Sequence, residues 1–350
     1  MNKLTGVERM KRVLRLEEPD VVPTIDFHNQ KLRDAILPGA SYEDFVEHMD
    51  LDGIIFFDKV SAWQYEIVSE SPRVLKDQWG GLVRFTSESL GVPIKPAIKL
   101  EKELEGYVPP DPDDPKRYKW LEELVKRFKG QRAVAVGATD VFDIAKESFL
   151  GDEAYFEAMI KNPSLVERIN EIVLKYNLGY LRNAIEMGAD VVLIAGDYAM
   201  TYGPFVSPKH TARFLTPYLK KQVDLAHQMG VPVIKHTDGD IRPIFELLLE
   251  TGINGLHPID PMAGMDLGET KKKYGSRICL CGNVSVAGTL SWEPVEKVRQ
   301  EVKDCIRKAG YGGGYICMSS NSIHSGVKPE NYVAMVKAIR EFGRYPLQLN

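Results

Sequence analysis

The chain has 350 residues, of which 44% are hydrophobic, so it can build one large domain or two small ones with a sizeable core. Its 45 basic and 49 acidic side chains are well mixed and give a net charge of −4, which argues against nucleic acid as the main partner. No apolar run approaches the roughly 20 residues of a membrane helix, and the charged N-terminal stretch is unlike a signal peptide. We therefore expect a cytoplasmic protein that binds neither nucleic acid nor a membrane.

Eight short apolar runs rich in Val and Ile alternate with helical patterns along the chain. They span residues 21–27, 52–58, 132–140, 190–197, 231–238, 253–260, 277–283 and 315–321. Nearly continuous apolar runs of this length are typical of parallel strands covered on both faces. We predict an α/β fold, a (β/α)8 TIM barrel formed by a single domain over residues 1–350. The main alternative is a doubly wound open sheet, which the lack of G-x-G-x-x-G after any strand disfavours.

The segments between these runs have helix start and stop signals. A helix over residues 207–230 should begin with Ser207 and Pro208 and end at Gly230, with Pro217 kinking or dividing it. Further helices are predicted over residues 116–129, 163–188, 293–310 and 328–343.

The interval from residue 59 to 114 does not fit the strand–helix repeat. Its stretch "KDQWGGLVRF" has β-prone residues on both sides of Gly80 and Gly81, as in a hairpin, and "YVPPDPDDP" marks a turn-rich break. We predict an insertion after the second strand, a lid or substrate-reading hairpin region on the top face of the barrel.

The C-terminal ends of the predicted strands carry ionisable and polar side chains. In a barrel of this kind the functional site is built from these ends. Because such groups are costly to bury without partners, they should face a ligand, a metal, water or one another. The candidates are Asp26, His28, Asp58, Asp140, Asp197, Tyr198, Tyr202, His236, Asp238, Asp240, His257, Asp260, Cys281, Asn283, Ser319, Ser320, Asn321 and His324.

Several of these residues also have a structural interpretation. Helix N-caps are the alternative for Asp58, Asp140 and Asp240, and a buried structural histidine is the alternative for His28 and His257. Two more aspartates are expected in structural roles, Asp260 in a proline-rich turn and Asp266 at a helix N-terminus.

His236 and Asp238 are the strongest candidates, because residues two apart on an extended strand point to one side. This pair could direct two ligands to one metal, or a histidine and a carboxylate to one substrate proton. A tight metal site needs further ligands, and the candidates to complete it are Asp197, Cys281, Cys317, Asn321 and His324.

Three segments resemble the uroporphyrinogen decarboxylase superfamily and, within it, the corrinoid-dependent methyltransferase branch. They are "GVPVIKHTDGDIRPIFELLLETGINGLHPIDPMAGMDL", "YGSRICLCGNV" and "GGGYICMSSNSIHSGVKPENYVAMVKAI". The resemblance covers most of the chain and implies a (β/α)8 barrel with its site at the C-terminal face of the strands.

Two departures refine what the resemblance implies. The decarboxylases have an arginine-rich stretch of the type R-Q-A-G-R for the porphyrinogen propionates, where this chain has "VVPTIDFHNQKLRDAIL". The thiol methyltransferases bind zinc with a His-x-Cys pair and a later Cys. Here His236 matches the histidine, Asp238 replaces the first cysteine and Asn321 stands at the second.

The remaining resemblance is to the methyltransferase component of an O-demethylase. It implies that a methyl group passes from a small methylated compound, an aryl methyl ether, to the Co(I) corrinoid of a separate corrinoid protein. The catalytic residues would be His236, Asp238 and Asp197. A metal, with zinc as the candidate, would be bound by His236 and Asp238. The substrate would contact Asp26, His28, Tyr198, Tyr202, His257, Asn283, Asn321 and His324.

Two other functions stay open at this point. One is a decarboxylase or lyase of the same superfamily, and the other is a non-catalytic barrel that binds a tetrapyrrole. The chain has no D-x-H-x-x-G corrinoid-ligating motif, so we expect the corrinoid on a partner protein. The sequence does not distinguish a monomer from a homodimer.

Overall fold

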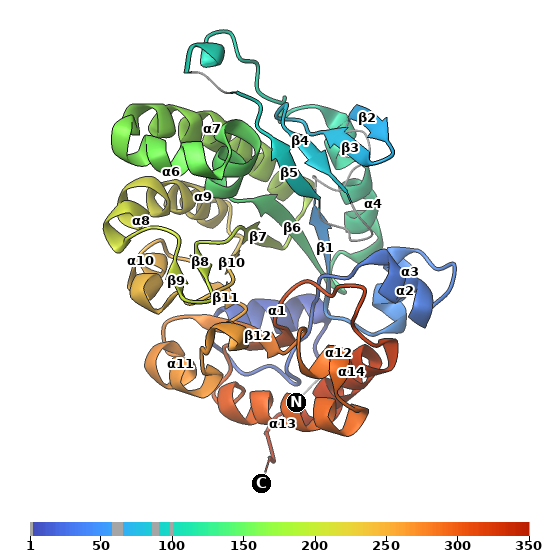
Figure 1. The fold of residues 1–350 in the computed structure, drawn as a ribbon. Helices are drawn as coiled ribbons and strands as arrows, with labels where there is room; N and C mark the ends of the chain where they lie inside the picture. Colours follow the sequence, from blue (N-terminus) through green and yellow to red (C-terminus); the bar gives the residue numbers. More distant parts are fainter. Residues whose placement is uncertain (1–2, 58–65, 86–90, 99–100, 350) are drawn as a thin grey trace.

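The computed structural model describes residues 3–57, 66–85, 91–98 and 101–349. A curled sheet of seven parallel strands forms the centre of the molecule (Figure 1), with neighbours in the order β1-β6-β7-β10-β11-β12-β13. The strands are β1 (Gly53–Phe57), β6 (Ala133–Thr139), β7 (Val191–Ala195), β10 (Val233–His236), β11 (Gly255–His257), β12 (Cys279–Val284) and β13 (Tyr315–Ser319). The first and last residues of each strand lie within three residues of the limits of the corresponding predicted run. Asp58 lies outside the described residues.

The first predicted strand is the exception, and its prediction is wrong. This segment, residues 21–27, makes only isolated bridges, one at Val21 and one at His28, just past its predicted end. It nevertheless lies between the two ends of the sheet, since the Pro23 carbonyl accepts from Cys317 N of β13 (3.1 Å) and the Thr24 carbonyl accepts from Asp52 N before β1 (2.8 Å). The (β/α)8 barrel is therefore confirmed, with an extended segment in place of its first strand.

Helices surround the sheet on its outer side (Figure 1). The longer ones are α1 (Gly6–Leu14), α4 (Lys119–Phe128), α6 (Asp152–Lys161), α7 (Pro163–Met187), α9 (Thr216–Gln228), α11 (Leu267–Tyr274), α13 (Val295–Ala309) and α14 (Pro329–Phe342). The shorter ones are α2 (Gln30–Ile36), α3 (Tyr42–His48), α5 (Val141–Asp143), α8 (Pro208–Phe214), α10 (Phe245–Leu249), α12 (Thr289–Trp292), the 3-10 helices η3 (Glu101–Leu104), η4 (Pro115–Tyr118), η6 (Arg242–Ile244) and η7 (Pro261–Ala263), and the π-helix η5 (Ile144–Leu150).

Local signals explain where several helices begin and end. Ser207 caps α8, and the predicted division before Pro217 occurs at Leu215, which separates α8 from α9. Asp266 caps α11, as predicted. Among the described residues, none of the helices is both long and apolar enough to cross a membrane.

The barrel interior is a compact apolar cluster separate from the core beneath the outer helices. The inner cluster contains Ile55, Ala135, Leu193, Ile234 and Met318 from the strands, together with residues of α1. Cys279 and Cys281 of β12 also belong to it. Because α1 contacts β1, β6 and β13, and its Leu14 lies beside Gly255, the first residue of β11, this helix closes the N-terminal end of the barrel.

An antiparallel sheet forms in the predicted insertion, at the top of the view in Figure 1. Its strands are β2 (Glu66–Glu70), β3 (Arg73–Lys76), β4 (Leu82–Arg84) and β5 (Val92–Lys95). The Ser148 and Phe149 carbonyls of η5 accept hydrogen bonds from Ala97 N (2.7 Å) and Ile98 N (3.0 Å). Since η5 follows β6, the insertion is tied to the C-terminal side of the barrel. Parts of residues 59–114 lie outside the described residues.

Candidate functional site

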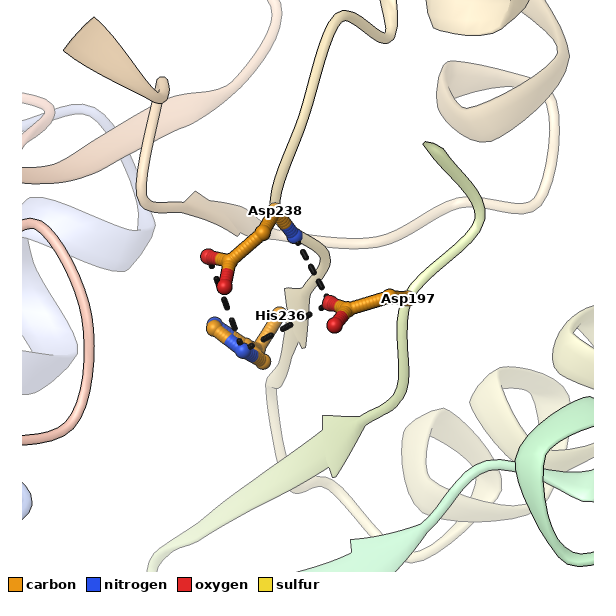
Figure 2. Close-up of side chains that lie close together, drawn as sticks. All are labelled: Asp197, His236 and Asp238. Atoms are coloured by element: carbon orange, nitrogen blue, oxygen red, sulfur yellow. Dashed lines mark hydrogen bonds and ion pairs between the residues drawn. The ribbon is translucent and has the colours of Figure 1, made fainter. Parts of the chain in front are cut away.

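The three side chains expected to be catalytic meet where β7 and β10 end (Figure 2). Asp197 follows β7, His236 is the last residue of β10, and Asp238 comes two residues later. Nε2 of His236 lies 3.8 Å from Oδ1 of Asp197 and 3.9 Å from Oδ1 of Asp238. The alternation along β10 thus brings His236 and Asp238 to the same side.

A network of hydrogen bonds holds the two carboxylates. Asp238 N donates to Asp197 Oδ1 (2.8 Å), and Asp197 N donates to Asp143 Oδ2 (3.1 Å). Asp143 in turn pairs with Lys146 of η5 (3.0 Å). On the other side, Asn321 Nδ2 donates to Asp238 Oδ2. The Asp197–His236–Asp238 cluster is therefore supported by elements that follow β6, β7, β10 and β13.

Asp238 is in an environment that disfavours its negative charge. Burial, followed by the nearby Asp197 and Asp260 carboxylates, raises the pKa of Asp238 to about 8. Its Oδ1 atom is buried and accepts no hydrogen bond from the described residues. The side chains remain partly accessible, with exposed fractions of 40% for Asp197, 24% for Asp238 and 14% for His236. An incoming ligand can therefore reach this cluster.

The donor set fits a divalent metal ion. One imidazole nitrogen and two carboxylate oxygens lie within 4.8 Å of one another. Zinc is bound in proteins by such nitrogen and oxygen donors, and catalytic zinc sites commonly keep a position open. A cation would also satisfy the buried Asp238 Oδ1 and relieve the repulsion between the two carboxylates.

A second histidine lies directly behind His236. Nδ1 of His257 is 2.7 Å from Nδ1 of His236, and Nε2 of His257 is 2.9 Å from the Ser319 carbonyl oxygen. Phe27 packs against both rings, with centroids 6.0 Å and 5.8 Å away. His257 is only 1% exposed, so it contacts His236 from inside the protein.

The remaining candidates of the first predicted strand lie in two buried environments. Asp26 accepts hydrogen bonds from Ser319 N and Oγ. Burial raises the pKa of Asp26 to about 7, although these bonds oppose the shift. His28 Nε2 lies 2.5 Å from the Tyr332 hydroxyl, and burial lowers the pKa of His28 to about 3.

Four candidates lie away from the Asp197–His236–Asp238 cluster. Tyr198 is buried and its hydroxyl donates to Asp140, while Tyr202 is 95% exposed on the turn between β8 (Ala199–Met200) and β9 (Gly203–Pro204). Asn283 donates to the Ile259 carbonyl and lines a cavity of about 670 Å³ between α13 and the segment that leads into α11. His324 is exposed and accepts from Gly326 N.

Sequence reasoning missed several supporting residues. Asp143 and Lys146 carry no signal in the sequence, because they lie inside a helical stretch rather than at a strand end. Lys235 was also missed, although a lysine inside the apolar run "VPVIKHTD" was a usable signal. Its Nζ is fully buried and bonds Asp140 (2.9 Å), which also caps α5. Asp260 orders its turn as expected and also accepts from Gly239 N (3.0 Å) beside the cluster.

Comparisons with known proteins agree with this architecture. A family model described as "Uroporphyrinogen decarboxylase (URO-D)" matches residues 74–342. The chain is 27% identical over 187 residues to a uroporphyrinogen decarboxylase of Hydrogenovibrio crunogenus, a match that spans 52% of this chain and 50% of that protein. It is 26% identical over 220 residues to the methylcobamide:CoM methyltransferase MtaA of Methanosarcina barkeri, covering 63% of this chain and 62% of that protein.

A solved structure is similar over nearly its whole length. It is a methyltransferase from Methanosarcina mazei, with a TM-score of 0.76 and 21% sequence identity, and the match covers 97% of this chain and 99% of that one. This similarity supports the barrel fold, and the family model spans well over half of the chain. The chain belongs to the uroporphyrinogen decarboxylase family.

Proposed function

We propose that this protein is a methyltransferase that moves a methyl group from a small methylated compound, an aryl methyl ether, to the Co(I) corrinoid of a separate protein. The observation that carries this proposal is the convergence of Asp197, His236 and Asp238 at the C-terminal end of the barrel. Two of the similar proteins, from Methanosarcina, are methyltransferases, and the name of one refers to a methylcobamide.

The chemistry explains why such a cluster is useful. Co(I) attacks the methyl carbon, the carbon–oxygen bond breaks, and the electron pair remains on oxygen. An alkoxide or phenoxide is a poor leaving group, so the protein must stabilise or protonate that oxygen as the bond breaks. A divalent ion held by His236, Asp197 and Asp238 would supply a Lewis acid at this point. Asn321, which holds Asp238, would keep that carboxylate oriented.

A decarboxylase activity on a porphyrinogen is less well supported. The segment that replaces the arginine-rich stretch, residues 21–37, contains a single arginine, Arg33. Its guanidinium lies 4.6 Å from the centroid of the Tyr42 ring. One arginine in this position gives little charge compensation for a substrate with many carboxylates.

The test is to incubate the purified protein with a reduced corrinoid protein and a series of methoxylated aromatics. We expect the absorbance of methylcobalt to appear with at least one donor. His236→Ala and Asp238→Ala should lose this signal together with bound metal. Release of CO₂ without methylcobalt would instead indicate a decarboxylase, and tetrapyrrole binding without turnover would indicate a carrier.

The metal assignment has its own readout. Metal analysis of the wild-type protein should find about one divalent ion per chain, lost in both variants. Activity in a protein free of metal, abolished by Asp238→Ala, would mean that Asp238 acts as an acid instead.

A further inference from the structure

We propose that His257 is a positioning residue that fixes the proton of His236 on Nδ1. The lone pair of the His236 imidazole is then on Nε2, the nitrogen that faces Asp197 and Asp238. This inference builds on the proposed role of the Asp197–His236–Asp238 cluster, but the proton position can be measured without any assay of that role. It goes beyond the expected part of His257 as a substrate contact, because His257 is buried behind His236.

The backbone carbonyl of Ser319 determines which nitrogen of His257 carries a proton. The Ser319 oxygen can only accept a hydrogen bond, and it lies 2.9 Å from Nε2 of His257. Nε2 of His257 must therefore carry a proton. In a neutral imidazole the other ring nitrogen then has no proton and accepts. Nδ1 of His257 is that acceptor, and its partner 2.7 Å away is Nδ1 of His236.

The surroundings of His257 keep it neutral. Its side chain closes the apolar interior of the barrel, next to Ile25, Phe27 and Met318. An imidazolium buried at 1% exposure against these apolar side chains would be costly, so a neutral ring with one donor and one acceptor is favoured.

The Ser319 carbonyl, from which this series of hydrogen bonds begins, is itself held in place. Ser319 is the last residue of β13, and Asp26 accepts from both its backbone N and its Oγ. The order of contacts is therefore Asp26, Ser319, His257, His236, and each residue comes from a different element around the barrel. These contacts also account for two of the predicted candidates, His257, which contacts the cluster through His236, and Asp26, which acts through Ser319.

The consequence concerns how His236 meets a ligand. A metal-binding histidine commonly donates its other ring N–H to a fixed acceptor, and loss of that acceptor typically costs 10–100-fold in metal affinity. Here the acceptor is another histidine. Without it, the neutral His236 ring could take the other tautomer, and a proton on Nε2 would block the lone pair that faces Asp197 and Asp238.

The direct test is the tautomeric state of the histidines in the metal-free wild-type protein. The chain has seven histidines, so ¹⁵N labelling of histidine gives a tractable spectrum. Two-bond ¹⁵N–¹H correlations distinguish Nδ1–H from Nε2–H, and the His236→Ala and His257→Gln variants assign the two signals. We expect Nδ1–H for His236 and Nε2–H for His257. A proton on Nε2 of neutral His236, or a doubly protonated His257, would overturn the proposal.

Two amide variants provide the matched comparison. In His257→Asn the side-chain oxygen can occupy the place of Nδ1 and still accept from His236. In His257→Gln the amide can reach the Ser319 carbonyl but leaves no acceptor beside His236. With zinc alone as the probe, in competition with a chromogenic chelator, we expect a loss of 10–100-fold for His257→Gln and only a small change for His257→Asn. Equal losses in both variants would contradict the proposal.

These readouts separate this inference from the proposed function. If the tautomers are as expected and no methyl transfer is found, the positioning role stands and the proposed reaction fails. If methyl transfer is found while His236 carries its proton on Nε2, the proposed reaction stands and the positioning role of His257 fails.

Discussion

Buried ionisable side chains around the barrel differ in whether a partner compensates them. Lys235 and Asp140 form a buried ion pair 2.9 Å apart, and Tyr198 also donates to Asp140. Asp26, in contrast, is buried with hydrogen-bond donors but no cation among the described residues. Removing only one partner of the Lys235–Asp140 pair is costly, because the other charge stays buried. The buried carboxyl group of Asp26 instead makes the stability of the protein depend on pH.

Asp26→Asn should change that pH dependence. The pKa of Asp26 is raised to about 7 in the folded protein, chiefly by burial. Between about pH 4, the usual pKa of an unfolded aspartate, and pH 7 the folded state binds more protons, so wild-type stability falls as pH rises. Asparagine mimics the protonated side chain and lacks this loss. In chemical unfolding, the variant should match the wild type near pH 4 and exceed it at pH 8.

A difference in unfolding free energy between Asp26→Asn and the wild type that stays constant from pH 4 to pH 8 would mean that Asp26 ionises normally in the folded protein.

Lys235→Met should destabilise the protein by about 3–5 kcal/mol, because it leaves the Asp140 carboxylate buried without its cation. The double variant Lys235→Met, Asp140→Asn removes that unpaired charge and should recover part of the loss. Equilibrium unfolding in urea at pH 7 measures both. If Lys235→Met alone is neutral, the pair contributes nothing to stability.

Side-chain direction decided which of the site residues could be predicted. His236 and Asp238 were predictable, because the two-residue period of a strand puts them on one side. Tyr198 was not, because it follows the end of β7, where the turn and its bond to Asp140 direct the ring into the core. The tautomer-setting contact of His257 was not predictable either, since it joins residues 21 positions apart through three-dimensional packing.

At the scale of elements, the loops after the strands determine the geometry of the site. Gly239 follows Asp238 with a φ of +88°, and an added Cβ would lie 2.6 Å from the Met200 carbonyl oxygen of β8. The same carbonyl accepts from Asp240 N (2.9 Å). The β8–β9 hairpin and the loop after β10 are therefore packed too closely for a side chain at this position.

Gly239→Ala should weaken the site and the fold together. The new Cβ adds a clash with β8 to the strain of a positive φ, so Asp238 should move and zinc affinity should fall. Gly264→Ala is the matched control, because Gly264 has a φ of +69° and nothing within 4 Å of an added Cβ. It should lose only the small amount of stability that a positive φ costs, less than Gly239→Ala loses, and keep its zinc affinity, as measured by thermal unfolding and chelator competition. Equal zinc affinities in the two variants would argue against the clash.

Asp77 fastens the inserted sheet to the barrel. Its Oδ1 accepts from Trp79 N and Gly81 N, both at 2.9 Å, and its Oδ2 accepts from Ser148 Oγ of η5 (2.8 Å). Asp77→Ala should therefore expose the insertion to limited proteolysis while zinc affinity stays unchanged. Lys95→Ala, at an exposed position of β5, should cleave like the wild type. Unchanged protection in Asp77→Ala would contradict this anchoring role.

Seven strands were predictable because each is an apolar run bounded by polar residues. The segment over residues 21–27 has the same composition but does not become a strand. Pro23 has no N–H to donate, and Thr24 N donates to the Asp52 side chain (2.8 Å) instead of a neighbouring strand. The four-stranded sheet of the insertion was only partly predictable, because β2 and β5 are exposed edge strands without an apolar pattern.

At the scale of the whole molecule, the barrel is closed at one end and accessible at the other. Met10, Val13 and Leu14 of α1 fill the N-terminal end, and the interior above them has a free volume of about 10 Å³. This is too little for more than about one water molecule. The Asp197–His236–Asp238 cluster lies at the opposite end, where the strands finish.

Met10→Ala should therefore affect stability without affecting the site. Removal of a fully buried methionine side chain typically costs about 2–5 kcal/mol through lost packing and the cavity left behind. Urea unfolding should report this loss, while the zinc affinity and the His236 tautomer stay as in the wild type. A change in zinc affinity would mean that the two ends of the barrel are coupled.

Because α1 closes the N-terminal end of the barrel, the proposed function also has a kinetic consequence. A methyl donor and a protein-bound cobalt centre would both have to reach the site through the C-terminal end of the barrel. The donor is by far the smaller of the two. The donor must then enter before the corrinoid protein docks, and the phenol product can depart only after that protein withdraws. Steady-state kinetics should accordingly follow a compulsory order, with the small molecule first in and last out.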